Sequence, residues 1–189
     1  QGAVALFAEA RQAVAACLDE APPYVRARVL EDGILEWTPE RLLAQGDEFR
    51  RIYKPISILP PDQYLSIVVQ ATEGCTWNRC TFCSFYQDRP FRAKPAEEFA
   101  RHVQEVKAFF GKGLLMRKGV FLADGNALAL SQGRIEPLLE ITRAAFPGEA
   151  IYSFVDVYTG ERRPVEGWRR LAQLGLTRVY IGMETGIDE

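Results

Sequence analysis

The stretch YLSIVVQATEGCTWNRCTFC, residues 64–83, decides the fold because it joins a predicted strand directly to a group of cysteines. Its first part, residues 64–72, is a short apolar run rich in β-branched side chains, which is typical of a buried strand. Its second part places Cys75, Cys80 and Cys83 in the spacing C-x4-C-x2-C. The sequence therefore predicts three thiols at the carboxyl end of a buried strand.

Beyond this stretch, short apolar runs alternate with amphipathic segments up to residue 189. Strict alternation of strands and helices predicts an α/β fold with a parallel sheet and right-handed crossovers. In such sheets, binding and catalytic groups gather at the carboxyl ends of the strands, where the cysteines are expected. The pattern predicts strands at residues 64–72, 118–126, 150–159 and 177–186, and helices at residues 97–110, 134–146 and 162–174.

The first part of the chain, residues 1–60, has a different pattern and is expected to form a mainly helical N-terminal extension. Amphipathic spacing predicts helices over residues 4–19 and 38–54, the second beginning with Thr38 as a cap. The remaining residues, 61–189, form the predicted α/β core. At roughly 30 residues per strand–helix unit, this core holds about four units. We therefore expect the core to be truncated after its fourth strand.

The composition is that of an ordinary globular protein. Of the 189 residues, 48% are hydrophobic and 25% are charged, which excludes general disorder. The net charge of −2 gives no reason to expect a nucleic acid or an acidic membrane as the main partner. No apolar run is long enough for a transmembrane helix.

Metal ligation is the best account of the three clustered cysteines. Three thiols cannot all pair with one another, and disulfides favour secreted chains. The fourth cysteine, Cys17, falls on a predicted helix face and is expected to be a small core residue. Zinc requires four ligands, or three and a water, and the only histidine, His102, lies far from the cysteines in sequence.

Three kinds of cysteine site remain open at this point. A [4Fe–4S] cluster usually has four Cys ligands, and with three one iron keeps an open site for an external ligand. Alternatively, the chain is a non-enzymatic iron–sulfur or zinc-binding protein whose fourth ligand is supplied elsewhere. A redox-sensing C-x2-C pair at Cys80 and Cys83 is also conceivable, but it leaves Cys75 unexplained.

The segment around the last two cysteines is basic. Arg79, Arg89, Arg92 and Lys94 against Asp88 give residues 75–95 a net charge of +3. This charge could attract an anionic substrate or an acidic electron donor, or it could belong to a solvated segment after the loop.

Taken together, the strand, the cysteine spacing and the polar residues at later strand ends resemble the radical S-adenosylmethionine (SAM) superfamily. The usual spacing there is C-x3-C-x2-C, and this chain has one extra residue, as do relatives that read G-C-x-x-N-x-C-x-F-C. The resemblance covers residues 64–189 and implies a partial (βα)6-type barrel with parallel strands. It also implies that Cys75, Cys80 and Cys83 hold a [4Fe–4S] cluster.

The resemblance further implies which residues contact SAM at four strand ends. An aromatic residue lies against adenine, a glycine-rich segment meets the amino group of methionine, and later strands supply polar contacts. For Asp156, a cap after the third strand is an equally open interpretation, and Glu184 too has a purely structural alternative. The implied contacts are Phe82, Asp124, Gly125, Asn126, Ser153, Asp156 and Glu184.

The activity that the resemblance implies is reductive cleavage of SAM to a 5′-deoxyadenosyl radical, which abstracts hydrogen from a substrate. The expected partner is a one-electron donor such as flavodoxin or ferredoxin, and the expected compartment is the reducing cytoplasm. The substrate stays open, because specificity in this family usually comes from later strands and C-terminal additions.

Overall fold

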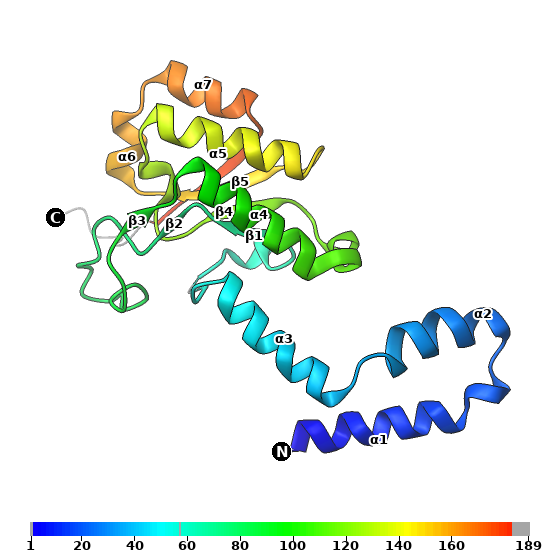
Figure 1. The fold of residues 1–189 in the computed structure, drawn as a ribbon. Helices are drawn as coiled ribbons and strands as arrows, with labels where there is room; N and C mark the ends of the chain where they lie inside the picture. The colour runs from blue at the N-terminus through cyan, green and yellow to red at the C-terminus, as the bar shows by residue number, and fades with distance from the viewer. Residues whose placement is uncertain (1, 57, 183–189) are drawn as a thin grey trace. The chain divides into compact units, whose positions relative to one another are not determined.

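A computed structural model describes residues 2–56 and 58–182 of the chain (Figure 1). The chain divides into two compact units, Gln1–Arg51 and Ile52–Glu189. Each unit is described by itself below.

The N-terminal unit is helical, as its sequence predicts. Thr38 caps α3 as expected, because its Oγ1 accepts a hydrogen bond from the backbone N–H of Arg41 at 3.1 Å. Arg11 ties two helices together by donating to the backbone O of Leu35 at 2.6 Å. The core position predicted for Cys17 is wrong, because this residue is exposed. The helices are α1 (Gly2–Ala16), η1 (Leu18–Glu20), α2 (Pro23–Val25), η2 (Arg26–Leu35) and α3 (Pro39–Ile52).

The C-terminal unit contains a parallel four-stranded sheet with the strand order β1-β4-β5-β6. Each pair of consecutive strands in that order is joined through helical segments, so the predicted α/β architecture is confirmed. The strands are β1 (Ile67–Gln70), β4 (Val120–Ala123), β5 (Ile151–Val155) and β6 (Leu176–Ile181). The longer helices of this unit are α4 (Ala96–Phe110), α5 (Gln132–Ala145) and α7 (Val165–Gln173).

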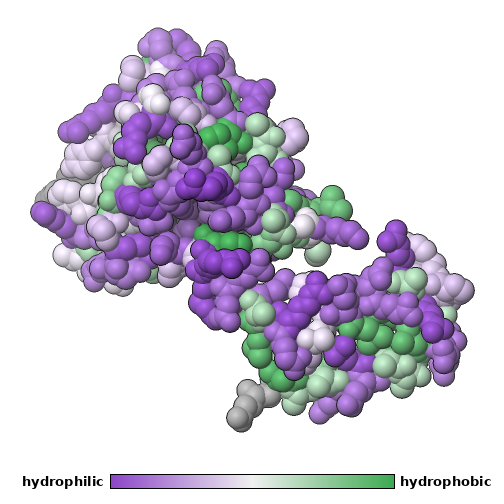
Figure 2. Space-filling view, viewed as in Figure 1, coloured by the Kyte–Doolittle hydropathy of each residue, from purple (hydrophilic) through white to green (hydrophobic). Residues whose placement is uncertain are grey.

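The core of this unit lies where apolar side chains of the strands meet those of the helices. These side chains are fully or almost fully buried, as a parallel sheet covered by helices requires. On the face shown in Figure 2, the surface of the unit is mostly hydrophilic, with small separate hydrophobic areas. Among the described helices, none combines the length and the apolar character needed to span a membrane. The largest buried side chains include Phe99, Phe121, Leu122, Leu128, Ile135, Leu139 and Leu171.

Two predicted boundaries around β5 are wrong for a local reason. The strand predicted to continue to residue 159 ends at Val155, and Val157–Arg162 form a short helix, α6. Asp156 causes this change, because its carboxylate caps α6 by accepting from the backbone N–H of Thr159 at 2.8 Å. The helix predicted to begin at residue 162 begins at Val165, directly after Pro164.

A second, very small sheet carries the cysteine-bearing segment. Thr72–Glu73 (β2) pairs antiparallel with Arg92–Ala93 (β3). The chain between these strands, residues 74–91, is called the cysteine loop below (Figure 1). Three short helices complete the unit: η3 (Pro61–Gln63), η4 (Gly111–Met116) and η5 (Ala127–Ala129).

Candidate functional site

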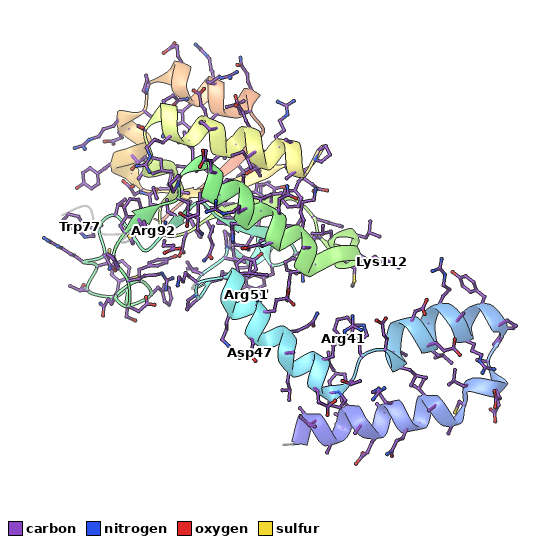
Figure 3. The ribbon with its side chains drawn as sticks, viewed as in Figure 1. Arg41, Asp47, Arg51, Trp77, Arg92 and Lys112 are labelled. Carbon is purple, nitrogen blue, oxygen red and sulfur yellow. The ribbon has the colours of Figure 1, made fainter. Side chains whose placement is uncertain are left out.

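The cysteine loop follows β1 and the two-residue strand β2, and charged side chains close it at its base. Arg92 of β3 donates to Glu73 of β2 at 2.8 Å and to Glu98 of α4 at 2.7 Å. Figure 3 shows Arg92 near the start of α4 and Trp77 at the outer part of the loop. The base of the loop is therefore fixed from both strands and from the first turn of α4.

A buried lysine strengthens the same base. Lys94 donates from Nζ to the backbone O of Gln70 at 2.8 Å, and its Nζ lies 3.8 Å from Oε1 of Glu73. Burial lowers the pKa of Lys94. Burial raises the pKa of Glu73, but Arg92 and Lys94 outweigh it and bring that pKa below its usual value. Arg92 and Lys94 of the basic segment therefore stabilise the base of the loop.

The three cysteines all lie on this loop and are half-buried. Within residues 2–56 and 58–182, no group of three or more Cys, His, Asp or Glu side chains is gathered closely enough to hold a metal ion. The donor set itself fits an iron–sulfur cluster, since Cys75, Cys80 and Cys83 supply three thiols within one short loop. Holding a cluster would thus require the loop to bring its sulfur atoms together.

The segment after β4 packs directly against the start of the cysteine loop. Gly125 has φ of +25°, and a Cβ added to it would overlap the backbone O of Gly74 and lie 2.9 Å from the Cα of Cys75. Only glycine permits this approach. Asp124 is joined to the same region, because Oγ1 of Thr72 donates to its backbone O at 3.1 Å. The carboxyl ends of β1 and β4 therefore meet beside the first cysteine.

Asn126 connects this segment to the end of β5. Its Nδ2 donates to Oδ2 of Asp156 and, at 3.4 Å, to Oγ1 of Thr159. Its Oδ1 is buried and has no hydrogen-bond partner among the described residues. Burial raises the pKa of Asp156, but its hydrogen bonds with Thr159 and Asn126 bring that pKa below the usual value. One buried acceptor at this edge is thus left available to a ligand.

Ser153, another predicted SAM contact, forms its hydrogen bonds within the sheet. Ser153 is fully buried and donates to the backbone O of Leu122 at 2.7 Å. Its register partners are Leu122 and Val179, so it lies on the face of the sheet opposite to Phe154 and Tyr180.

Phe82 and Glu184 are the other two predicted contacts. Phe82 lies on the cysteine loop and is 69% exposed as a residue, so the ring is open to a ligand or to solvent. Glu184 lies outside the described residues.

His102, on α4, is a structural residue. It is buried, and its Nε2 accepts a hydrogen bond from the backbone N–H of Gln70 at 2.9 Å. Burial, followed by the positive charge of Lys94, lowers the pKa of His102 to about 4. A neutral imidazole therefore supports the carboxyl end of β1.

A comparison with protein families agrees with this arrangement. The family model of the radical SAM superfamily matches residues 69–189, which include the end of β1, the cysteine loop and the other three strands of the parallel sheet. The chain belongs to the radical SAM superfamily. No curated protein and no solved structure matches the chain significantly. Members of the radical SAM superfamily normally use an iron–sulfur cluster and SAM, so a radical SAM-type function follows for this chain in general terms.

Several residues at this edge of the sheet were not among the predicted contacts. Thr72 of β2 and Tyr86 of the cysteine loop are buried, and Arg89 of the same loop is largely buried. The positive charge of Arg89 is visible in the sequence, but its partner is Asp124, which lies 35 residues further along the chain. A local pattern cannot show such a pair.

Proposed function

We propose that the protein is a radical SAM enzyme in which Cys75, Cys80 and Cys83 hold a [4Fe–4S] cluster. The observation that carries the proposal is the position of these thiols in a superfamily member: they lie on one loop that follows β1, the first strand of the parallel sheet, and the short strand β2. The base of the loop is held by Glu73 and Arg92, which supports a role in presenting ligands.

The chemistry of this proposal comes from the bound groups. A [4Fe–4S] cluster held by Cys75, Cys80 and Cys83 would leave one iron open for SAM and would supply the electron for reductive cleavage of its S–C5′ bond, which would release methionine and give the 5′-deoxyadenosyl radical that abstracts hydrogen from a substrate. The chain's own residues would ligate the cluster, orient SAM and exclude water.

Two of the implied SAM contacts have structural support as ligand-binding groups. The buried, unpartnered Oδ1 of Asn126 could accept a hydrogen bond from an ammonium group. The exposed ring of Phe82 offers an apolar surface for a base. The roles of Ser153, Asp156 and Glu184 as contacts rest on the resemblance alone.

The proposal also includes a partner and a compartment. A one-electron donor such as flavodoxin or ferredoxin would reduce the protein. Three thiols reserved for metal ligation are typical of a reducing compartment, and we place the protein in the cytoplasm.

Anaerobic reconstitution with iron and sulfide tests the proposal directly. We expect about four iron and four sulfide per chain with a broad visible absorption, and formation of 5′-deoxyadenosine from SAM under reduction. Cys80→Ala should abolish both the uptake of the cluster and the formation of 5′-deoxyadenosine. Cys17→Ala is the matched control, because Cys17 is exposed and lies in the N-terminal unit.

The same experiment separates the alternatives. Tight binding of one colourless zinc ion, or a cluster that neither binds nor cleaves SAM, would show that the protein binds a metal without acting as a radical SAM enzyme. Equal iron content in the Cys80→Ala and Cys17→Ala variants would contradict the ligand assignment.

A further inference from the structure

The cysteine loop is attached to β4 by a largely buried ion pair. Arg89, near the end of the loop, has a side chain only 9% exposed, and Asp124, directly after β4, has one only 4% exposed. Nη2 of Arg89 donates to Oδ2 of Asp124 at 3.2 Å. We propose that Arg89 is a positioning residue that holds the cysteine loop against the segment 124–126.

Arg89 is suited to this role because its guanidinium joins three separate parts of the unit. Besides Asp124, Nη2 donates to the backbone O of Pro55 at 2.9 Å, in the segment that precedes β1. Nη1 donates to both carboxylate oxygens of Asp88, at 2.7 and 3.0 Å. The planar fork of arginine makes this set of bonds possible, and a lysine could not reproduce it.

Asp124 also forms several hydrogen bonds with the residues around it. Its Oδ1 accepts from the backbone N–H of Gly125 at 2.9 Å, while its Oδ2 faces Arg89. Its backbone N–H donates to Oγ1 of Thr72 at 3.3 Å. Both carboxylate oxygens therefore have protein partners, and Asp124 acts on a ligand through its neighbours, Gly125 and Asn126.

The ion pair also reaches the middle of the cysteine loop. Tyr86 is buried, and its ring centroid lies 5.3 Å from the guanidinium carbon of Arg89. The backbone O of Tyr86 accepts a hydrogen bond from Nδ2 of Asn78 at 2.8 Å. Asn78 has φ of +49° and lies between Cys75 and Cys80. A chain of contacts thus runs from the end of β4 to the part of the loop between two cysteines.

The loss of Arg89 should therefore free the loop without removing a ligand. The carboxylate of Asp124 would be left buried without its counter-charge, which favours rearrangement of the segment 124–126. The consequence for SAM binding rests on the proposed function, whereas the attachment of the loop is a property of the metal-free chain.

Hydrogen–deuterium exchange of the metal-free full chain tests the attachment itself. In Arg89→Met we expect the amides of Cys83 and Gln87, which donate to backbone O atoms within the loop, to exchange at least about tenfold faster, which corresponds to about 1.4 kcal/mol of lost protection. Amides of β4 and β5 should keep their rates. Arg79→Met is the matched control, because Arg79 is an exposed arginine on the same loop. Unchanged exchange in Arg89→Met would overturn the inference.

A second measurement tests the consequence for the loaded protein. After reconstitution, we expect Arg89→Met to raise the KM for SAM by at least about fivefold with a smaller change in kcat. Arg89→Lys should lie between the wild type and Arg89→Met in both experiments. Equal KM values for SAM in the wild type and Arg89→Met would overturn the role toward SAM.

The two proposals fail in different ways. If the wild type takes up no cluster, the proposed function fails, and the exchange comparison still decides whether Arg89 holds the loop. If Arg89→Met does not fold, Asp124→Asn replaces it, since this variant removes the charge and keeps the shape of the side chain. Slow loop exchange in Asp124→Asn, equal to that of the wild type, would then overturn the inference.

Discussion

At the scale of single residues, His102 shows how a buried neutral group supports the strand that leads to the cysteines. Its Nε2 can accept from the backbone N–H of Gln70 only while the imidazole is neutral. Lys94, whose Nζ donates to the backbone O of Gln70, adds a positive charge nearby. Protonation of His102 in the folded chain is opposed by both burial and this charge.

This arrangement predicts a pH dependence of stability. The pKa of His102 is about 4 in the folded state and about 6.5 in an unfolded chain. Its contribution is complete above pH 6.5 and is lost as the pH falls toward 4, because the unfolded state takes up the proton first. We expect the metal-free chain to lose about 2 kcal/mol of unfolding free energy between pH 7 and pH 5.

Urea unfolding at the two pH values measures this loss. His102→Gln is the control, since its amide O can accept the same hydrogen bond but does not titrate. His102 is the only histidine of the chain, so no other histidine contributes in this range. A similar loss of stability in His102→Gln would assign the effect to other groups.

Gly125 gives a second prediction at the residue scale. Gly125→Ala would place a Cβ against the backbone of Gly74 and Cys75, where no flexible side chain can move away. We expect a loss of about 2 kcal/mol or more in unfolding free energy, together with reduced iron uptake.

Gly133→Ala is the matched control for this prediction. Gly133 lies in α5, and an added Cβ would meet nothing within 4 Å. This change should be neutral or stabilise the chain by up to about 1 kcal/mol. Equal stabilities of the two variants in urea would show that the approach of Gly125 to Gly74 has no energetic importance.

At the scale of elements, α6 depends on one side chain. The carboxylate of Asp156 caps this helix by accepting from the backbone N–H of Thr159, and it also accepts a hydrogen bond from Nδ2 of Asn126. We expect Asp156→Ala to lower the unfolding free energy by about 1 to 2 kcal/mol, whereas Asp156→Asn keeps a capping oxygen and loses less. A KM for SAM that is unchanged in Asp156→Asn would favour the cap over a direct contact; a large rise would favour the contact.

The elements also show what the sequence can and cannot predict. The amphipathic helices α4 and α5 agree with the prediction to within two residues, because many apolar positions repeat along each of them. Val157, Tyr158 and Thr159 are β-branched or aromatic and continue the strand pattern, yet the cap at Asp156 turns them into a helix. The hydrogen bonds of one side chain decide this boundary, and hydrophobic periodicity cannot predict them.

The cysteine site illustrates the same limit. The thiols and the segment 124–126 are visible in the sequence because their residue types carry the chemistry. The two-residue ladder of β2 and β3 is too short for any periodic signal. Arg89 and Asp124 find each other only through the folded sheet, so their role depends on tertiary structure.

At the scale of the whole molecule, the chain consists of a helical N-terminal unit and an α/β unit that begins at Ile52. The segment before β1 is bound to the sheet by side chains. Tyr53 donates from its hydroxyl to the backbone O of Val68 at 2.8 Å, and the side chain of Gln70 bonds the backbone N–H and O of Lys54. These bonds explain why the compact unit starts well before the first strand.

The two outer strands of the sheet are also connected, although β4 and β5 lie between them. The hydroxyl of Tyr180 in β6 accepts from Nε2 of Gln63 at 2.7 Å and donates to Oδ2 of Asp62 at 2.7 Å. Asp62 and Gln63 lie in η3, just before β1, and Oγ of Ser66 donates to Oε1 of Gln63 at 2.6 Å. The segment that enters the sheet is therefore bound to the strand at its opposite edge.

This connection predicts a measurable effect of one hydroxyl group. Tyr180→Phe removes the bond to the buried Gln63 amide and should lower the unfolding free energy by about 1 kcal/mol. Tyr152→Phe is the matched control, because Tyr152 lies on the neighbouring strand β5 and is half-buried like Tyr180. Urea unfolding of the two variants compares them. If Tyr180→Phe is as stable as Tyr152→Phe, the hydrogen bonds between Tyr180 and η3 contribute nothing to the unfolding free energy, and the sheet and its helices alone hold the outer strands.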